Sequence, residues 1–392
     1  MFKLLKNGTC LTPDNIGIKD VLIVGSKIYK VEENIPENYL PETQVFDCSG
    51  KFILPGFIDQ HVHITGGGGE SGPETRIPEL MLSSVISSGI STIVGVLGFD
   101  DIFRSPHELW AKAKALEHEG LNTYMYCGSY SIPAPTITGR IATDIALIDK
   151  VVGVGEIAIS DYRSSYPSYE VLAGIAAEAM KGALLGRKAG VVHIHVGDGK
   201  VGISPLIELV KKSDYPMVMF VPTHLNRNKA LFEQAIRYAK EGGNIDLTAG
   251  ESSEVGYSVP DAMERLFKEG VDMGRVTVSS DGNGSVPAGG QNEIAVGRPV
   301  QLFEDIKKCI TEKGLDMVSV IKTVTSNVAN VLKIFPEKGA IRYKSDADIL
   351  ILNSNDFSID KLIINGDLFM DNGNIVKKGV FDAKNTNVQM NK

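Results

Sequence analysis

The amino-acid sequence predicts an α/β protein: a (β/α)8 TIM barrel joined to a small β-sandwich domain built from both chain termini. Strand-like and helix-like stretches alternate through the middle of the chain, and eight such units in about 280 residues fit a barrel better than a doubly wound sheet. Short β-like segments occur at both ends of the chain. We therefore expect the β-domain in residues 1–51 and 336–392 and the barrel in residues 52–335.

The β-like segments at the two ends share one pattern. Residues 20–31 contain two apolar strands separated by a Gly-Ser turn at 25–26. Similar apolar stretches with turn residues return at 346–352 and 362–376. Because these segments flank a single central block, we predict that they pair into one small domain.

The barrel strands are expected at regular intervals along the central block. Residues 52–58 are apolar enough for a buried first strand. Apolar runs of similar length predict the remaining strands at 92–97, 122–128, 151–159, 190–196, 217–223, 244–248 and 275–280.

Helices are expected between these strands. The helix at 106–119 has Ser105 as its predicted N-cap, Pro106 at its first position and Gly120 just past its end. Ser204 is the predicted cap of a helix at 205–213. The other helices are predicted at 78–88, 166–186, 229–241, 260–269, 302–313 and 316–333.

Composition excludes several classes of protein. With 43% hydrophobic and 22% charged residues, the chain is typical of a globular protein, and its apolar runs are shorter than a membrane span of about 20 residues. A net charge of −8 argues against nucleic acid or anionic membrane as a partner. Polar residues interrupt segment 1–8 where a signal peptide needs a continuous apolar stretch, so we expect a cytoplasmic protein. The four widely spaced cysteines suggest neither disulfides nor a thiolate metal site.

Histidines lie where predicted strands end. His61 and His63 follow the first strand, and side chains two residues apart on a strand point to the same face. His195 and His224 close two later apolar runs, and Asp281 follows the last strand. Four histidines and one aspartate from four strand ends form a ligand set suited to one or two divalent ions such as zinc.

The remaining histidines have other predicted places. His193 shares its strand face with His195 but lies deeper, so we interpret it as a core residue or a neighbour of the ligands. His107 and His118 lie on a predicted helix among polar residues, and we expect both at the surface.

Five motifs at these strand ends carry a resemblance to a known family. They are Gly56–His63 with the following four glycines and Glu70, Thr136–Gly139, Ser160–Ser164, Pro222–Asn228 and Ser279–Ser285. Together they resemble the amidohydrolase superfamily and, more narrowly, its isoaspartyl (β-aspartyl) dipeptidases, from about residue 50 to 335. Motifs this long and numerous are highly specific.

The resemblance implies a site with two Zn²⁺ ions per subunit, other divalent metals being possible. His61 and His63 would bind one ion and His195 and His224 the other, while Asp281 would ligate the first ion and act as general base. A hydroxide shared by the ions would be the nucleophile.

One position departs from the family pattern. Many members carry, on the fourth strand, a lysine carboxylated on its side-chain nitrogen, which bridges the metals; here Glu156 stands there. Lys150, the nearest lysine on the same strand face, would lie about 20 Å away and cannot substitute. Our hypothesis is that the Glu156 carboxylate bridges the metals; the alternatives are a glutamate facing a polar layer or a partly emptied second metal site.

The resemblance also implies how the substrate would be held. Glu70 would bind the α-amino group of a β-aspartyl dipeptide, and the carboxylates would be bound by Arg163, Arg227 and Ser285. Tyr130 would help to hold the oxyanion of the tetrahedral intermediate; otherwise it is a loop tyrosine packed on the barrel.

These inferences predict a zinc metallohydrolase, a β-aspartyl dipeptidase that cleaves the isopeptide bond. The alternatives are an amidohydrolase acting on cyclic amides, of the dihydroorotase or hydantoinase kind, and a non-catalytic assembly protein of the same superfamily. The expected partners are a small dipeptide substrate and, because family members assemble, further copies of the chain in a homo-oligomer. The loop 286–299 would serve either an interface or an active-site lid.

Overall fold

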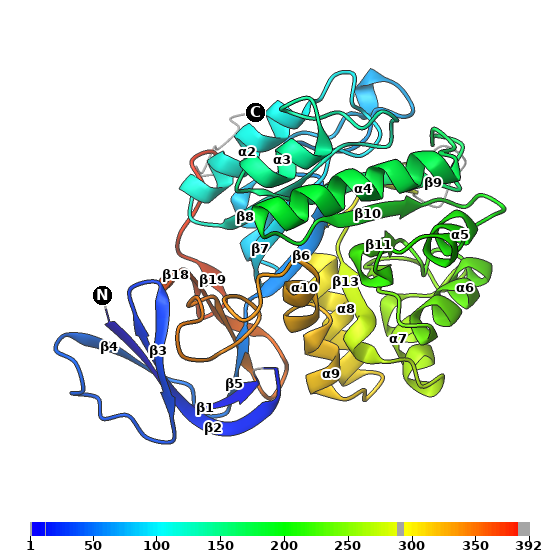
Figure 1. The fold of residues 1–392 in the computed structure, drawn as a ribbon. Coiled ribbons are helices and arrows are strands. Elements are labelled where there is room, and N and C mark those ends of the chain that lie inside the picture. Colours follow the sequence, from blue (N-terminus) through cyan, green and yellow to red (C-terminus); the bar gives the residue numbers. More distant parts are fainter. Residues whose placement is uncertain (1, 12, 288–293, 383–392) are drawn as a thin grey trace, which may run out of the picture.

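The computed structural model describes residues 2–11, 13–287 and 294–382, and it has the predicted α/β architecture. Parallel strands curl into a barrel with helices outside, and a separate sheet is formed by both ends of the chain (Figure 1). The blue N-terminal strands and the orange-red C-terminal strands lie together at one side of the barrel.

Nine strands form the terminal sheet within the described residues, in the order β19-β18-β17-β16-β5-β1-β2-β3, with β4 paired to β1. From the N-terminal side come β1 (Phe2–Leu11), β2 (Asn15–Val24), β3 (Lys27–Glu32), β4 (Thr43–Asp47) and β5 (Lys51–Pro55). From the C-terminal side come β16 (Ile349–Asn353), β17 (Ile359–Ile364), β18 (Asp367–Asp371) and β19 (Asn374–Ile375). A small apolar core joins both sets, including Leu5, Val21, Ile53, Ile351 and Ile363.

The strand expected over 52–58 is in fact two strands. β5 lies in the terminal sheet, where Ile53 pairs with Ile351 of β16, whereas β6 (Phe57–Val62) begins the barrel. Gly56 separates them, and a Cβ at this position would collide with the Ser91 side chain. The last three residues of β5 and all of β6 are buried, so the apolar run hides the boundary. The predicted division between residues 51 and 52 therefore cuts β5 after its first residue and assigns the rest of this strand to the barrel.

The barrel is built from eight parallel strands within the described residues. β6 to β11 form one sheet in sequence order, and β12 pairs with β13. The remaining barrel strands are β7 (Ile90–Gly95), β8 (Asn122–Cys127), β9 (Val151–Ile159), β10 (Val191–Val196), β11 (Phe220–Thr223), β12 (Ile245–Thr248) and β13 (Val276–Ser279). The segment after β13 returns to β6, where Gly282 bridges to Val62. The carboxyl ends of all these strands therefore meet at one face.

Helices cover the outside of the barrel (Figure 1). They are α1 (Leu82–Ile86), α2 (Pro106–His118), α3 (Ile141–Leu147), α4 (Tyr169–Gly186), α5 (Ser204–Lys212), α6 (Lys229–Lys240), α7 (Val259–Lys268), α8 (Val300–Thr311), α9 (Met317–Lys322) and α10 (Ser326–Val331). Short 3-10 turns occur at Pro73–Thr75, Met217–Met219 and Met273–Arg275. Among the described residues, no helix is both long and apolar enough to cross a membrane.

The helix ends test the predicted caps. Ser105 Oγ accepts a hydrogen bond from the Glu108 amide, which confirms it as the N-cap of α2. Ser204 is not a cap, because it is already the first residue of α5, and its amide bonds instead to the Val201 carbonyl. The single helix expected over 316–333 is divided into α9 and α10, and α3 was not predicted.

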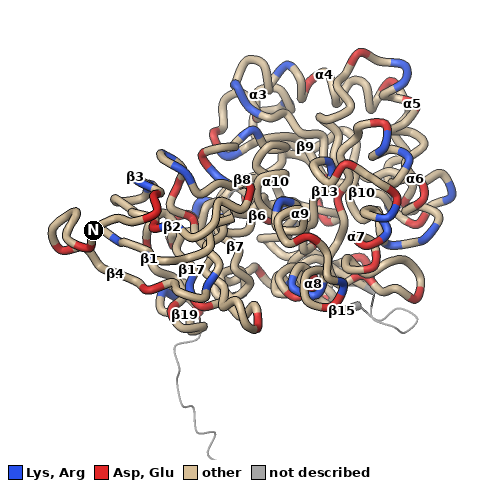
Figure 2. The backbone as a smooth tube through the Cα atoms, turned by 90° about the horizontal axis from the view of Figure 1, so that it is seen from below, with Lys and Arg blue, Asp and Glu red and all other residues tan. Residues whose placement is uncertain are grey.

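The surface carries charges of both signs (Figure 2), and the segment after β13 contains short strands. Lys and Arg residues are interspersed with Asp and Glu along the outer helices (Figure 2). Within the loop predicted at 286–299, β14 (Ser285–Pro287) and β15 (Ile294–Val296) form an antiparallel pair. Residues 288–293, on which the interface or lid would depend, lie outside the described residues.

Candidate metal centre

Six predicted ligand residues converge at the carboxyl face of the barrel. They come from five strands or the residues directly after them, and all are buried. The six are His61, His63, Glu156, His195, His224 and Asp281. The parallel strands bring them together because each side chain stands at the same end of its strand.

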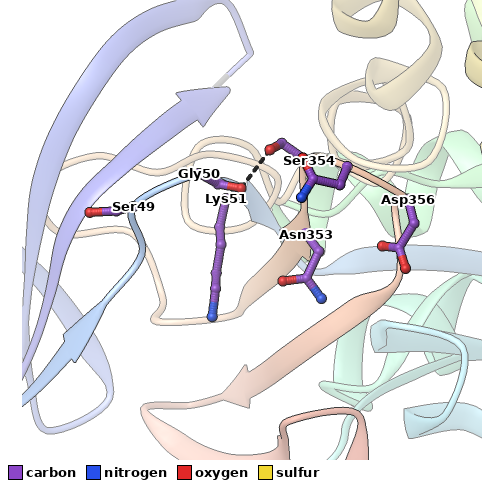
Figure 3. A pocket seen from close by; sticks show the side chains of 7 residues that line it. Ser49, Gly50, Lys51, Asn353, Ser354 and Asp356 are labelled. Atoms are coloured by element: carbon purple, nitrogen blue, oxygen red, sulfur yellow. Dashed lines mark hydrogen bonds between the residues drawn. The ribbon is translucent and has the colours of Figure 1, made fainter.

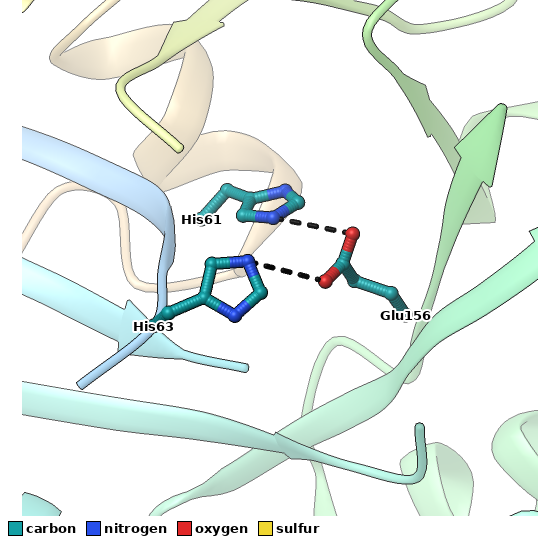
Figure 4. A group of neighbouring side chains, drawn as sticks. All are labelled: His61, His63 and Glu156. Atoms are coloured by element: carbon teal, nitrogen blue, oxygen red, sulfur yellow. Dashed lines mark ion pairs between the residues drawn. The ribbon is translucent and has the colours of Figure 1, made fainter. Parts of the chain in front are cut away.

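The carboxylate of Glu156 lies at the centre of the group. Its Oε2 atom is 3.2 Å from His61 Nε2, 3.4 Å from His195 Nδ1 and 3.6 Å from His224 Nε2. Its Oε1 atom is 3.5 Å from His63 Nε2, so one oxygen faces each nitrogen of the first pair (Figure 4). Glu156 thus belongs to two groups of potential metal ligands, one with His61 and His63 and one with His195 and His224.

Asp281 stands with the first histidine pair. Its Oδ1 atom is 3.1 Å from His63 Nε2 and 3.5 Å from His61 Nε2. Burial alone would raise the pKa of Asp281, but His63, His61 and His224 hold that pKa below its usual range. The carboxylate is therefore kept in the form that can bind a cation or accept a proton.

Contacts behind His61 and His224 leave the other nitrogen of each of these two rings facing the centre. His61 Nδ1 is 2.9 Å from His193 Nε2, and His224 Nδ1 is 2.7 Å from Thr248 Oγ1. His193 accordingly lies behind a ligand, as expected from its depth in β10, while His107 and His118 are exposed on α2. Such outer contacts orient metal-binding imidazoles.

Charge and burial in this group fit a divalent cation pair. Both oxygens of Glu156, Asp281 Oδ1 and His61 Nε2 are buried, and among the described residues none of them has a hydrogen-bond partner. Burial raises the pKa of Glu156, yet His61, His195 and His224 hold it well below its usual range, and Glu156 in turn raises the pKa of His61 to about 9. A buried anion with unpaired oxygens is costly unless a cation neutralises it. Imidazole nitrogens with carboxylate oxygens are a donor set found in catalytic zinc sites.

The residues predicted to hold substrate lie beside this group. Glu70 Oε1 accepts hydrogen bonds from Arg163 Nη1, at 3.1 Å, and from Ser285 Oγ, at 2.7 Å. The Tyr130 hydroxyl is 2.6 Å from His195 Nδ1, which places it against the metal ligands. Arg227 points elsewhere, donating to the Val196 carbonyl at 3.0 Å, but it lies at the same end of the barrel.

The glycine loop before Glu70 is held by a residue that the sequence analysis missed. The buried guanidinium of Arg104 donates to the backbone carbonyls of Thr65, Gly67 and Ile77. Gly66 adopts φ 85°, and a Cβ there would collide with the Ile77 carbonyl. The backbone leading to Glu70 is therefore tightly constrained.

Asp161 and Glu251 were also missed. Asp161 Oδ2 lies 2.9 Å from His195 Nε2, and Glu251 Oε1 lies 3.9 Å from Arg227 Nε. Asp161 stands in the Ser-Asp-x-Arg motif two residues before Arg163, so its motif and its place after β9 were available signals. For Glu251, only its position after β12 could have indicated a role.

The terminal sheet carries a hollow of its own. It has a volume of about 320 Å³ and is lined by polar side chains of the β5 and β16 ends, with Ser354 Oγ donating to the Gly50 carbonyl at 2.6 Å (Figure 3). Its lining residues contain none of the predicted site residues.

Comparisons with known proteins agree with this geometry. The model of the Amidohydrolase family matches residues 52–369. The solved structure of a β-aspartyl dipeptidase from Fervidobacterium islandicum, in complex with β-Asp-Leu dipeptide, is 44% identical and covers 96% of this chain and 98% of its own, with a TM-score of 0.90. The two folds are therefore alike over nearly their whole lengths.

More distant relatives carry other names. A dihydroorotase from Elusimicrobium minutum is 25% identical over 226 residues, which are 55% of this chain and 49% of the relative, so the match spans about half of that protein. A 5-methylthioadenosine/S-adenosylhomocysteine deaminase from Thermococcus kodakarensis is 22% identical over 412 residues, covering 97% of this chain and 93% of its own. Both similarities are weaker than that to the dipeptidase.

Proposed function

This chain belongs to the amidohydrolase family, and we propose that it is a metal-dependent dipeptidase that hydrolyses the isopeptide bond of β-aspartyl dipeptides. The observation that carries the proposal is the contact of Glu70 with Arg163 and Ser285 beside the histidine cluster. One anion among cationic and hydroxyl donors suits a ligand with a free α-amino group and carboxylates. The 44% identity with a β-aspartyl dipeptidase supports the same substrate class.

The proposed metal site contains two divalent ions, with zinc as the expected metal. His61, His63 and Asp281 would hold one ion, His195 and His224 the other, and Glu156 would bridge them. When bound, such ions supply hydroxide near neutral pH, because they lower the pKa of water from 15.7 to about 7, and they polarise the scissile carbonyl. The Glu156 carboxylate offers two oxygens and one negative charge without requiring carbon dioxide.

The residues around the metals would divide the remaining tasks. Asp281, whose pKa is held low, accepts a proton at its carboxylate and delivers it to the leaving amine. Tyr130 donates its hydroxyl hydrogen to the oxyanion that forms on the carbonyl oxygen.

Substrate orientation would come from the groups beside the cluster. Glu70 is already oriented by two hydrogen bonds, so the substrate ammonium would meet an anion in a set position. Arg163, Ser285 and Arg227 bind the two carboxylates, for which the planar guanidinium fork is suited.

The test is hydrolysis of β-Asp-Leu beside α-Asp-Leu by purified protein supplied with zinc. We expect cleavage of the β-linked peptide alone and loss of activity in a chelator-treated sample. Glu70→Gln should lower kcat/KM by about 10- to 100-fold through lost ammonium binding, while Glu74→Gln, in the 3-10 turn nearby, serves as the matched control.

The opposite results have defined meanings. If two zinc ions bind but neither peptide is cut, the substrate assignment is wrong and cyclic amides become the next substrates to test, in line with the dihydroorotase similarity. If no divalent ion binds, the metal proposal fails and the non-catalytic alternative is favoured. The homo-oligomer and the cytoplasmic location stay predictions, to be measured by light scattering and cell fractionation.

A further inference from the structure

A buried carboxylate outside the ligand group links the metal ligands to the substrate residues. Asp161 follows β9 and is only 4% exposed. Its Oδ1 accepts from Arg163 Nε at 3.0 Å, and its Oδ2 accepts from Arg163 Nη2 at 2.7 Å. The same Oδ2 is 2.9 Å from His195 Nε2. One carboxylate therefore serves an arginine and an imidazole at once.

The contact with His195 decides which ring nitrogen can bind metal. An ionised carboxylate only accepts hydrogen bonds, so His195 Nε2 must carry the hydrogen that lies between them. The other nitrogen, Nδ1, then carries the lone pair that can bind metal. It lies 3.4 Å from Glu156 Oε2 and 2.6 Å from the Tyr130 hydroxyl, which can donate a hydrogen bond to it. A carboxylate behind a histidine commonly orients a metal ligand in this way and makes it more basic.

The contact with Arg163 extends the connection to the substrate side. Arg163 Nη1 donates to Glu70 Oε1 at 3.1 Å, while its other two guanidinium nitrogens hold Asp161 in a fork. The guanidinium also lies over the Tyr130 ring, 5.4 Å from the ring centre. Glu70, Arg163, Asp161 and His195 thus form an unbroken chain of polar contacts.

We propose that Asp161 is a positioning residue that holds His195 in the tautomer whose Nδ1 binds metal and sets the guanidinium of Arg163 for substrate. The proposed role of Asp161 toward His195 is independent of the substrate, whereas its role toward Arg163 rests on the proposed function. Asp161 touches no reacting atom; it acts through His195 and Arg163.

The role toward His195 is tested by how firmly the protein holds its metal ions. The variant Asp161→Asn is dialysed against graded concentrations of chelator. We expect it to lose one of its two zinc ions at a chelator concentration about 10- to 100-fold lower than the wild type requires. The matched control is Asp144→Asn, a fully buried carboxylate at α3 that bonds to the Ile137 and Thr138 amides away from the ligands. Retention of both ions by a folded Asp161→Asn protein, at wild-type chelator resistance, would overturn the proposal.

A measurement on the wild type covers the case in which the Asn variant does not fold. In zinc-bound protein labelled with ¹⁵N-histidine, His195 should show a hydrogen on Nε2, with its signal assigned through His195→Gln. A hydrogen on Nδ1 would contradict the proposed tautomer. If Asp161 served only to pack, its replacement would change neither the tautomer of His195 nor the zinc content of the protein.

The role toward Arg163 is tested by steady-state kinetics at saturating zinc. Asp161→Asn should raise the KM for β-Asp-Leu by about tenfold, because Arg163 loses its fork, and Asp161→Glu should recover part of this loss by restoring the charge. An unchanged KM in Asp161→Asn would show that Asp161 does not set Arg163 for substrate. If the wild type does not cleave β-Asp-Leu, the proposed function fails, while zinc retention still decides the role of Asp161.

Discussion

At the scale of single residues, Glu156 is the group shared by the two sets of potential metal ligands. It is fully buried in β9 and faces four histidines from three other strands. A neutral side chain of the same shape would remove the negative charge that would offset the two proposed cations. Glu156 therefore offers the sharpest test of the bridging hypothesis.

We predict that Glu156→Gln binds fewer than two zinc ions per subunit and loses more than about 100-fold in kcat/KM, because the anionic bridge is lost. Metal analysis after gel filtration, together with steady-state kinetics, measures both quantities. Glu208→Gln, a glutamate exposed on α5, is the control and should match the wild type. Two ions still tightly held in Glu156→Gln would end the bridging hypothesis.

Tyr130 gives a second prediction. Its ring packs edge-on against Phe99 and its hydroxyl lies against His195, so Tyr130→Phe keeps the packing and removes only the donor. We expect kcat to fall by about 100- to 1000-fold with little change in KM, as when other oxyanion donors are removed. The control is Tyr126→Phe, whose hydroxyl is buried without a hydrogen-bond partner among the described residues. Equal losses in binding and turnover would count against the oxyanion role.

Residues at strand ends were predictable, but the residues that support them were less so. Glu156 stood out because a charge inside an apolar strand needs a partner. Arg104 gave no such signal: its partners are backbone carbonyls, which every residue carries. Thr248 reaches His224 only because β12 lies near β11, and that closeness follows from the fold rather than from either local sequence.

At the scale of elements, a predicted helix or strand agrees with the observed one where its local sequence pattern outweighs contacts from distant parts of the chain. β9 matches its prediction at both ends because its nine residues are all buried and apolar apart from Glu156. The helix expected over 316–333 breaks at Thr323–Thr325, where the Val278 amide bonds to the Thr323 carbonyl. That bond comes from a distant strand. α3 is only seven residues long, too short for its periodicity to distinguish it from a loop.

Two glycines should respond oppositely to substitution by alanine. Gly174 lies on the exposed face of α4 with open space around it, so Gly174→Ala should stabilise the protein by about 0.5–1 kcal/mol. Gly66→Ala should destabilise it and raise KM, because its positive φ and the Ile77 carbonyl exclude a Cβ. Urea denaturation and kinetics measure both effects. A Gly66→Ala protein with unchanged KM would show that the loop does not position Glu70.

At the scale of the whole molecule, a polar network joins the terminal sheet to the barrel. Asp348, just before β16, accepts from Lys338 Nζ at 2.6 Å and from Asn122 Nδ2, at the start of β8, at 3.0 Å. Its other oxygen accepts from the Asn365 amide at 2.8 Å. Because Lys338 is nearly buried, its charge depends on Asp348 and Asp346. The two parts of the molecule are therefore coupled electrostatically.

This network predicts a dependence of stability on pH. Burial alone would raise the pKa of Asp346, but Lys338 and Lys27 hold it below its usual value. A lowered pKa contributes stability above the unfolded value of about 3.9, and that contribution is lost as the pH falls through the folded value. Asp346→Asn should thus be less stable than the wild type by about 1–3 kcal/mol at pH 7. The difference should shrink below about pH 4.

Urea denaturation of both proteins between pH 3 and pH 8 measures this difference. Asp214→Asn, an exposed aspartate just after α5, is the control for general acid effects. A gap between wild type and Asp346→Asn that stays constant down to pH 3 would contradict the prediction.

The position of β5 has a consequence for how the protein is made. β5 lies between β1 and β16, and its Ile53 pairs with Ile351. During translation, one edge of β5 therefore stays unpaired while the ribosome makes the entire barrel. An apolar strand with an open edge can pair with other chains. The nascent protein is accordingly most prone to aggregate just before β16 emerges, and interruption of synthesis at that point releases a chain with all its candidate metal ligands and an open terminal sheet.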